Sequence, residues 1–390
     1  MVDLVKRRFL KQWLCAPGVY GLCGLWSNVL LAEDSKRQNK ALMAADINGV
    51  RLPPGYHSRI VARSSQPVIS GRDYLWHAAP DGGACFVSAD GGWIYVSNSE
   101  MDDAQGGVGA LVFDADGRVI DGYSILRHTS RNCAGGATPW GSWLSCEEVK
   151  DGRVWECYPD GKRKAVVRPA LGVFNHEAVA VDEKNFQLYL TEDKPDGCLY
   201  RFTADRLNNE GFPDLSAGIL EVAVGSARKE GVLTLDWAKP GDPQALSQPT
   251  RYQVADAMTF NGGEGIVYNN ERIIFTSKGD DRVWSYHPAS QKLEILYDAE
   301  DSHTPILTGV DNVTVSQSGD IYVAEDGGDL QIVVIDTHGE LYPIVQLVAH
   351  DESEITGVAF SPDGKRLYFS SQRGTTGRSE NGVTYEITGF

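Results

Sequence analysis

The feature that most constrains the fold is a unit of short strands that recurs along the chain. Each copy has an apolar strand, an Asp-Gly or equivalent turn, typically a Tyr-containing strand that ends in an acid, and a third apolar strand. The copies begin at Ala84, Gly141, Ala178, Gly265, Val313 and Gly357. Antiparallel units spaced by roughly 40–50 residues are typical of β-propeller blades.

We therefore predict an all-β fold, a six-bladed β-propeller that forms one domain over residues 46–390. The 42 glycines and 17 prolines favour many turns and few long helices. A strand within residues 46–60 is expected to complete a blade. Residues 208–255 fit no blade and are predicted to be an inserted loop region that packs over one face. A β-sandwich is the alternative, but it does not explain the repetition.

The N-terminal segment differs in composition from the rest of the chain. Basic residues, among them Arg7 and Arg8, precede an apolar run from 13 to 31. This order is typical of a secretory signal, and the arginine pair resembles a twin-arginine motif. We expect residues 1–32 to be a signal peptide or an uncleaved anchor, residues 33–45 to be a linker, and the protein to be periplasmic or secreted. No other apolar segment is long enough to cross a membrane.

The net charge of −17 argues against nucleic acid as a partner, because the surface would repel phosphate backbones. It is compatible with bound cations, and also with plain solubility. We expect a monomer. Five cysteines remain after residue 32, so at least one thiol stays unpaired in an exported monomer. They are Cys85, Cys133, Cys146, Cys157 and Cys198. Cys133, which lies among glycines, is the candidate for that thiol.

The segment from Asn132 to Glu148 combines two cysteines, three glycines, a proline and two adjacent carboxylates. Its glycines allow tight turns, and the residues around Trp143 read as a short strand that ends on the two acids. A thiol at one end and paired carboxylates at the other are what a hard-metal site with one soft ligand needs. The alternative is a tight loop with a buried cysteine and a solvated acidic edge.

Acids recur at two fixed places in the repeat. One set stands just before strands that read as innermost in their blades: Glu177, Glu264, Asp311 and Glu354. The other set closes the strand that follows: Glu100, Glu148, Glu192 and Glu325. The innermost strands of a propeller line its axis, so these carboxylates are expected to converge there and to bind polyvalent metal such as Ca²⁺. The alternative is that each acid independently caps a turn or pairs at a blade edge.

At these residues the chain resembles the PhoX-type alkaline phosphatases, and in particular short, single-propeller members. The likeness extends from about Pro53 to the C-terminus and is densest at Asn132–Glu148, His176–Asp182 and Glu354–Gly364. The resemblance implies an exported, calcium- and iron-dependent phosphomonoesterase with its metal cluster at the propeller axis.

The resemblance also implies roles for individual residues. Cys133 would be the thiolate on iron, and it is a catalytic candidate together with Glu148. The other implied metal ligands are carboxylates: Glu177, Glu264, Glu354, Glu100, Asp311 and Glu325. A basic residue that grips the phosphoryl group is expected, and Lys278 and Arg373 are the candidates, with Arg131 as a further choice.

The expected reaction is hydrolysis of small-molecule phosphate monoesters. No P-loop and no Gly-x-Ser-x-Gly elbow is present, which removes the usual signals for nucleotide binding and for a serine esterase. A calcium-dependent lactonase or esterase is the rival enzyme. A non-catalytic, calcium-stabilised propeller that serves as a binding platform is the third alternative. Iron together with calcium would favour the phosphatase, and calcium alone the other two.

Overall fold

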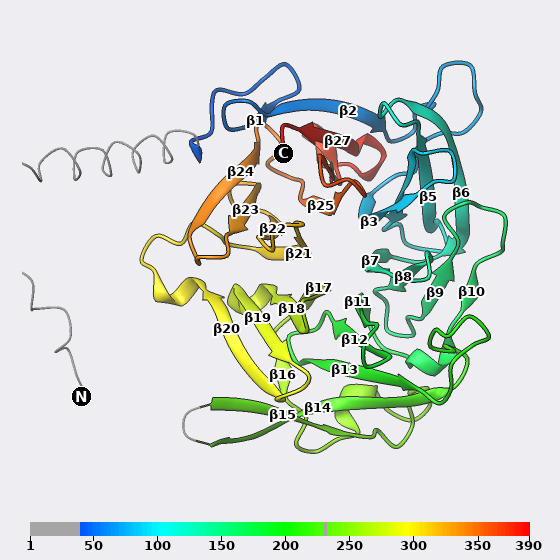
Figure 1. Cartoon of the computed structure of the whole chain (residues 1–390), viewed down its shortest axis with the longest axis vertical. Helices are drawn as coiled ribbons and strands as arrows, with labels where there is room; N and C mark the ends of the chain where they lie inside the picture. The colour runs from blue at the N-terminus through cyan, green and yellow to red at the C-terminus, as the bar shows by residue number, and fades with distance from the viewer. Residues whose placement is uncertain (1–39, 230–231) are drawn as a thin grey trace, which may run out of the picture. The chain divides into compact units, whose positions relative to one another are not determined.

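Short β-strands arranged around a ring form the regular structure of the chain (Figure 1). The computed structural model describes residues 40–229 and 232–390, and Leu42–Phe390 forms one compact unit. The predicted signal or anchor at residues 1–32, and most of the predicted linker, lie outside the described residues. Within the described ranges, the helical elements are 3-10 turns at Pro169–Leu171, Thr250–Tyr252, Lys278–Asp280, Ala299–Asp301, Gly374–Thr376 and Ser379–Asn381. In those same ranges, no helix has the length and apolar character needed to span a bilayer.

The first three repeats consist of consecutive antiparallel strands, numbered from the innermost outward. Repeat 1 contains β3 (Pro80–Val87), β4 (Trp93–Ser99), β5 (Gly106–Phe113) and β6 (Val119–Thr129). Repeat 2 contains β7 (Asn132–Ala137), β8 (Trp143–Glu147), β9 (Val154–Cys157) and β10 (Val166–Val167). Repeat 3 contains β11 (His176–Asp182), β12 (Gln187–Glu192), β13 (Gly197–Ala204) and β14 (Gly218–Lys229).

The last three repeats follow the same plan. Repeat 4 contains β17 (Gly263–Asn269), β18 (Arg272–Ser277), β19 (Arg282–His287) and β20 (Lys292–Asp298). Repeat 5 contains β21 (Val310–Val315), β22 (Ile321–Glu325), β23 (Gln331–Ile335), β24 (Leu341–Leu347) and the short β1 (Val50–Arg51). Repeat 6 contains β25 (Ile355–Phe360), β26 (Arg366–Ser371), β27 (Val383–Thr388) and the early strand β2 (His57–Arg63).

The sequence prediction had left out the innermost strand of repeat 2. The copy that it placed at Gly141 begins with β8, the second strand of the repeat, whereas β7 has the sequence Asn-Cys-Ala-Gly-Gly-Ala. Such small residues have low strand propensity. Their smallness allows close packing instead, because a Cβ at Gly136 would lie 1.9 Å from the carbonyl oxygen of Val179 in β11.

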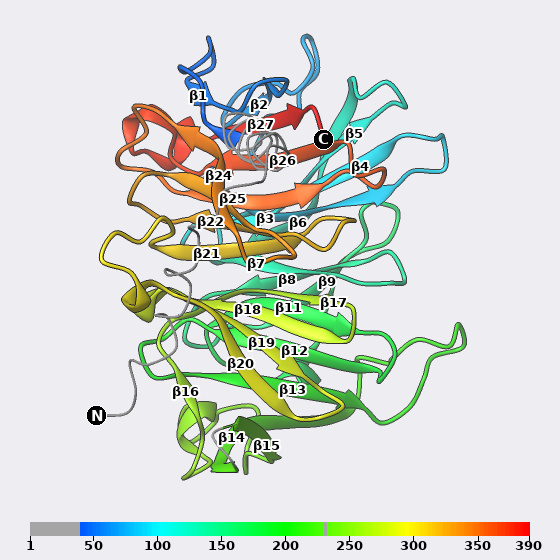
Figure 2. The ribbon, with the colours of Figure 1, turned by 60° about the vertical axis from the view of Figure 1, so that its left-hand side comes forward.

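The innermost strands contact one another in the order β3, β7, β11, β17, β21 and β25, and β25 returns to β3 (Figure 1). The hydrogen-bonded sheets are fewer than the six separate blades predicted. Four repeats are separate sheets, whereas repeats 3 and 4 belong to one ten-stranded sheet. The region predicted to be an inserted loop provides the link, because β15 (Val232–Ala238) pairs with both β14 and β20. In Figure 2 this sheet lies at the end of the ring away from β2 and β27.

The cores lie between neighbouring sheets, so middle strands are buried on both faces. All seven residues of β4 and all five of β23 are buried. Between repeats 1 and 6, for example, Tyr95 stacks on Tyr368 with ring centroids 5.2 Å apart. Each fully buried large side chain of this kind contributes about 1.5–3 kcal/mol, and together these contacts hold the innermost strands at fixed spacing.

Candidate metal centre at the ring axis

A β-bulge lies at the same place in the innermost strand of every repeat. Pairing with the second strand shifts after Pro80, Asn132, His176, Gly263, Val310 and Thr356. In repeats 1 to 5, the next residue carries a carboxylate or a thiol: Asp81, Cys133, Glu177, Glu264 and Asp311. A bulge re-aims side chains and ends regular pairing, so these five depart from the alternation of their sheets.

Repeat 6 departs from this pattern. Its bulge falls on Gly357, whose φ is +67° and where a Cβ would lie 2.7 Å from the carbonyl oxygen of Asp81. Glycine tolerates both the left-handed backbone and the close approach. The carboxylate of this repeat comes instead from Glu354, directly before β25.

A second set of polar residues directly follows the second strand of each repeat, and we call it the axial row. Its members are Glu100, Glu148, Asp193, Lys278, Asp326 and Gln372. Four are acids, one is a lysine and one is an amide. The two sets meet because innermost strands of neighbouring repeats are in contact.

Together the two sets form four overlapping groups, in each of which the potential ligand atoms lie within 4.8 Å of one another. The first group is Asp81, Glu100 and Cys133. The second group is Cys133, Glu148 and Glu177. The third group is Glu177, Glu264 and Asp311, and the fourth is Asp311, Asp326 and Glu354. Because consecutive groups share a member, they form one continuous arc at the ring axis.

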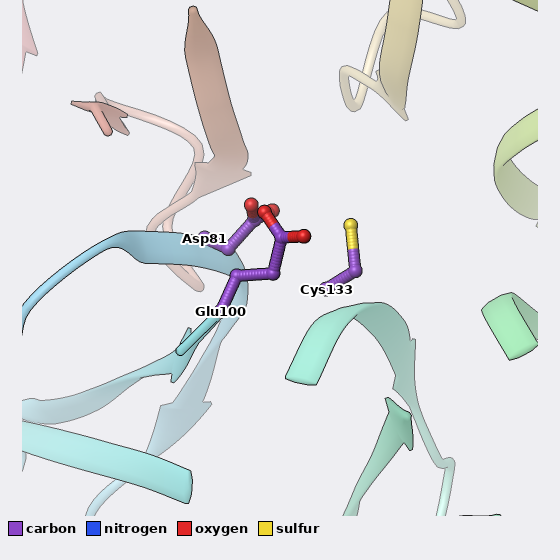
Figure 3. Close-up of side chains that lie close together, drawn as sticks. All are labelled: Asp81, Glu100 and Cys133. Atoms are coloured by element: carbon purple, nitrogen blue, oxygen red, sulfur yellow. The ribbon is translucent and has the colours of Figure 1, made fainter. Parts of the chain in front are cut away.

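Figure 3 shows the first group, in which the three side chains approach one another from separate segments. The Cys133 thiol also donates to Glu177 Oε1 at 3.2 Å, which links the first group to the second. Burial raises the pKa of the Cys133 thiol well above its usual value, and the carboxylates of Asp81 and Glu177 raise it further. A cation bound beside the sulfur would favour the thiolate.

The carboxylates of the cluster are held in a costly state. Burial raises the pKa values of Asp81, Glu177 and Glu264 well above the usual range, and neighbouring carboxylates add to the shift. Burial likewise raises the pKa values of Glu148 and Asp311 to about 7, although basic neighbours oppose the shift. Carboxyl groups this close all ionise only when bound cations neutralise them, and otherwise some of them stay protonated.

The donor set fits bound metal cations. It contains eight carboxylates and one thiol. Among the described residues, three basic side chains form ion pairs with it: Arg131, Lys278 and Arg373. Carboxylate oxygens are the usual ligands of Ca²⁺, and a thiolate beside carboxylates suits a transition metal. The excess negative charge and the buried thiol therefore agree with a mixed metal cluster.

The basic residues predicted to bind phosphate lie at the cluster. The Lys278 amine is 3.0 Å from Glu264 Oε1 and 3.2 Å from Asp326 Oδ2. Arg373 Nη1 is 2.8 Å from Glu354 Oε1. Arg131 Nη2 lies between Glu100 and Glu148, at 2.6 and 2.5 Å. All three are thus held by carboxylates of the cluster.

The structure does not bring Glu325 into any of the four groups. Its carboxylate accepts the backbone N–H groups of Thr308 and Gln331, and the next residue, Asp326, occupies the axial row. Side chains alternate between the faces of a strand, so a change of one residue moves an acid from one face to the other. Glu192, which was also expected to converge at the axis, lies in none of the groups either. The other predicted metal ligands each lie in at least one group.

Glu325 belongs to a second row of acids, the blade row, formed by the last residue of the second strand: Glu147, Glu192 and Glu325. Glu192 is fully buried and accepts from Tyr200 Oη at 2.7 Å and Arg251 Nη1 at 3.0 Å. Glu147 accepts from Trp155 Nε1. The blade row therefore binds groups of its own sheet and adjoining loops.

Two members of the cluster were missed by the sequence prediction, Asp81 and Asp326. Asp81 precedes Gly82 in a segment that was assigned to no strand. A comparison between the repeats of the chain could have identified it, because Asp81-Gly82 stands at the same place in its repeat as Glu264-Gly265. Asp326 directly follows Glu325, and only the strand register decides which of the two belongs to the axial row.

A cavity of about 380 Å³ continues from the cluster along the innermost strands. Its wall consists mainly of small and apolar residues that follow the ligands in sequence, among them Ala134, Ala178, Gly265 and Val313. The polar cluster thus lies at one end of the cavity, and the rest of the cavity wall has few polar side chains.

The comparison with protein-family models matches residues 118–165 and 154–374 to the family described as Alkaline phosphatase PhoX. The chain belongs to the PhoX family. The matched residues include the members of the axial row and the blade row between Glu147 and Asp326, and also Glu354. Most of the cluster therefore lies within the part of the chain that matches the family. A sequence comparison with curated proteins gives no match.

Solved structures agree on the fold. Pseudomonas fluorescens PhoX in complex with vanadate, a transition-state analogue, aligns with a TM-score of 0.72 at 15% identity, covering 90% of this chain and 97% of that one. XC5397 from Xanthomonas campestris, a gluconolactonase, aligns with a TM-score of 0.52 at 12% identity, covering 89% and 97%. A Bacteroides thetaiotaomicron protein of unknown function has a TM-score of 0.52 at 9% identity, covering 85% and 76%. PhoX membership and the PhoX fold support phosphatase activity.

Proposed function

We propose that this PhoX-family chain is an exported, calcium- and iron-dependent phosphatase that hydrolyses small phosphate monoesters at the ring axis. The observation that carries the proposal is the continuous arc of eight carboxylates and one buried thiol. Cys133, with Glu148 and Glu177, would hold iron, and the carboxylates of the other groups would hold calcium. Bound metals would supply charge stabilisation for phosphoryl transfer and an activated oxygen nucleophile.

The residues of the chain provide positioning. Bulges and packed innermost strands fix the ligand side chains, which preorganises the site. We propose that Arg373, which lies at the edge of the cluster with 31% of its side chain exposed, donates to the oxygens of a phosphoryl group. Lys278, the other proposed phosphate-binding residue, is already shared among carboxylates. Arg131 holds Glu100 and Glu148 in place.

We further propose that the ring has six blades, with repeats 3 and 4 as two blades fused through β15. The closed order of contacts among the six innermost strands and the bulge shared by every repeat support this count. Export rests on the signal-like sequence of residues 1–32, and we expect the exported protein to act as a monomer.

The test is hydrolysis of a chromogenic phosphate monoester by purified protein supplied with calcium and iron, together with elemental analysis. We expect turnover, both metals in the protein, and loss of iron and activity in Cys133→Ala. The matched control is Cys157→Ala, a buried free thiol in the same repeat. Absence of turnover, or unchanged turnover in Cys133→Ala, contradicts the proposal. Calcium without iron, combined with lactone hydrolysis, would indicate the rival lactonase.

A further inference from the structure

Three of the four groups of potential ligands follow one rule that relates them to the repeats. In the first group, Asp81 is the bulge residue of repeat 1, Glu100 is its axial-row residue, and Cys133 is the bulge residue of repeat 2. The second group repeats this pattern one step further along the ring. The fourth group does so in repeat 5, with Glu354 in place of a bulge residue in repeat 6. Each of these three groups thus lies between two neighbouring repeats. The third group differs, because its members are bulge residues of three successive repeats and no axial-row acid joins them.

Repeat 4 has the same geometry but a different residue. Its bulge residue is Glu264, the next bulge residue is Asp311, and the axial-row residue between them is Lys278. The amine lies 3.0 Å from Glu264 Oε1 and 3.8 Å from Asp311 Oδ2. It therefore contacts the two residues that, by the rule, would flank a cation.

The backbone at Lys278 leaves little freedom. The N–H of Lys278 donates to the carbonyl oxygen of Gly262, and the N–H of Gly279 donates to that of Asn261. A Cβ at Gly279 would lie 2.4 Å from the Asn261 side chain, which would have to move to accept it. The amine is thus held over the carboxylates by a tightly packed turn.

Three carboxylates surround the amine. Besides those of Glu264 and Asp311, Asp326 Oδ2 lies 3.2 Å away. Glu264 and Asp311 are both buried, so they have little access to water as an alternative source of stabilisation.

From these observations we propose that the ammonium group of Lys278 takes the place of a divalent cation between repeats 4 and 5. This inference rests on the proposed function, because it concerns the same cluster. It goes further by predicting which positions in the cluster bind metal and which one does not. Between repeats 4 and 5 the positive charge comes from a side chain of the protein. At the corresponding positions after repeats 1, 2 and 5 it comes from a bound metal ion. A chelator cannot remove the lysine cation.

The test replaces the lysine by the acid found elsewhere in the axial row. Lys278→Asp, stripped with a chelator and reloaded with calcium chloride, is expected to bind one more calcium ion per chain than the unmodified protein, as measured by elemental analysis and calorimetric titration. The control is Lys184→Asp, which makes the same charge change at an exposed lysine paired with Glu271. Equal stoichiometry in Lys278→Asp and the unmodified protein overturns the inference.

A second variant keeps the inference testable if Lys278→Asp does not fold. Lys278→Met removes the charge without adding a ligand. We expect the chelated variant to melt at a lower temperature than the chelated unmodified protein, and calcium to raise its Tm by more. An unchanged Tm response overturns the inference, because an incidental ion pair would behave in that way.

Failure of this inference is distinguishable from failure of the proposed function. If the unmodified protein binds no metal and cleaves no phosphate ester, the proposed function fails. If it binds metal and cleaves the ester, but Lys278→Asp gains no calcium, only the inference on Lys278 fails.

Discussion

The axial row and the blade row are neighbours in sequence but lie in different environments. In repeats 2, 3 and 5 the two rows are adjacent acid pairs, Glu147-Glu148, Glu192-Asp193 and Glu325-Asp326. The blade-row acids accept hydrogen bonds from donors of their own sheet and adjoining loops. Glu148 and Asp326 of the axial row lie instead within the cation groups.

The difference shows that the role of a carboxylate in this ring depends on strand register more than on residue type. Adjacent residues of one strand end thus differ: one acid accepts hydrogen bonds within its own sheet, and the next lies in a cluster of carboxylates. Substitutions in the axial row should therefore change metal content and activity, whereas substitutions in the blade row should change stability.

The largest effect is expected in the cluster itself. Glu177→Gln removes a negative ligand shared by the second and third groups. Activity on a phosphate ester should fall by more than about 100-fold, beyond the usual loss for outer-shell partners of a metal. The control is Glu183→Gln, an exposed acid close by in sequence. Similar activity in both variants would exclude a ligand role for Glu177.

The next largest effect is expected in the blade row. Glu192→Ala leaves the Arg251 guanidinium and the Tyr200 hydroxyl without their buried partner. Loss of one member of a buried ion pair costs about 3–5 kcal/mol in the free energy of unfolding, which denaturant titration would measure. Activity per folded molecule should persist. The exposed Glu210→Ala should change stability by less than about 0.5 kcal/mol.

An adjacent pair provides the sharpest separation of the two rows. Asp326→Asn should weaken calcium binding by about tenfold with little effect on the stability of the metal-free protein. Glu325→Gln should lower stability by about 1–3 kcal/mol, because it no longer offers charged acceptors to two backbone N–H groups, and it should leave calcium binding intact. Calcium titration and unfolding of both variants measure this. If the two act alike, the distinction between the rows is wrong.

The smallest effect concerns a histidine outside both rows. His77 Nε2 lies 3.2 Å from Ser97 Oγ, and burial lowers the pKa of His77 from 6.5 to about 3. The unfolded chain takes up a proton as the pH falls below about 6.5, but the folded chain does not. The free energy of unfolding therefore has its full value above pH 6.5 as far as His77 is concerned. It falls between pH 6.5 and 3 by up to about 1.4 kcal/mol per pH unit. His77→Gln should show a shallower decline in unfolding free energy between pH 7 and 5.

Much of the architecture could be predicted from the sequence, because the repeated strand pattern depends on local alternation and on turns. The fusion of repeats 3 and 4 could not, since β15 pairs with β20 more than fifty residues later. For the same reason, the region predicted to be a loop contains two long strands.

The candidate site shows where sequence reasoning reaches its limit. Recurrence identified Glu177 and Glu264, and the composition of the Asn132–Glu148 segment identified Cys133. The structure brings all three into one cluster. Recurrence did not choose correctly between Glu325 and Asp326 for the axial row. Side chains alternate between the two faces of a strand, so either acid could face the axis until pairing with the neighbouring strands fixes the register. Asp81 was missed because its bulge interrupts the regular pattern of β3.

The pairing of β2 with β27, and of β1 with β24, has a consequence for biosynthesis. Strands β1 and β2 are translated well before their partners β24 and β27. Asp81 comes from β3 and Glu354 directly precedes β25, two strands that contact only when the circle is shut. A nascent chain that has not reached β25 therefore holds at most a fragment of the cluster, and the complete centre is assembled only after β25 has been translated.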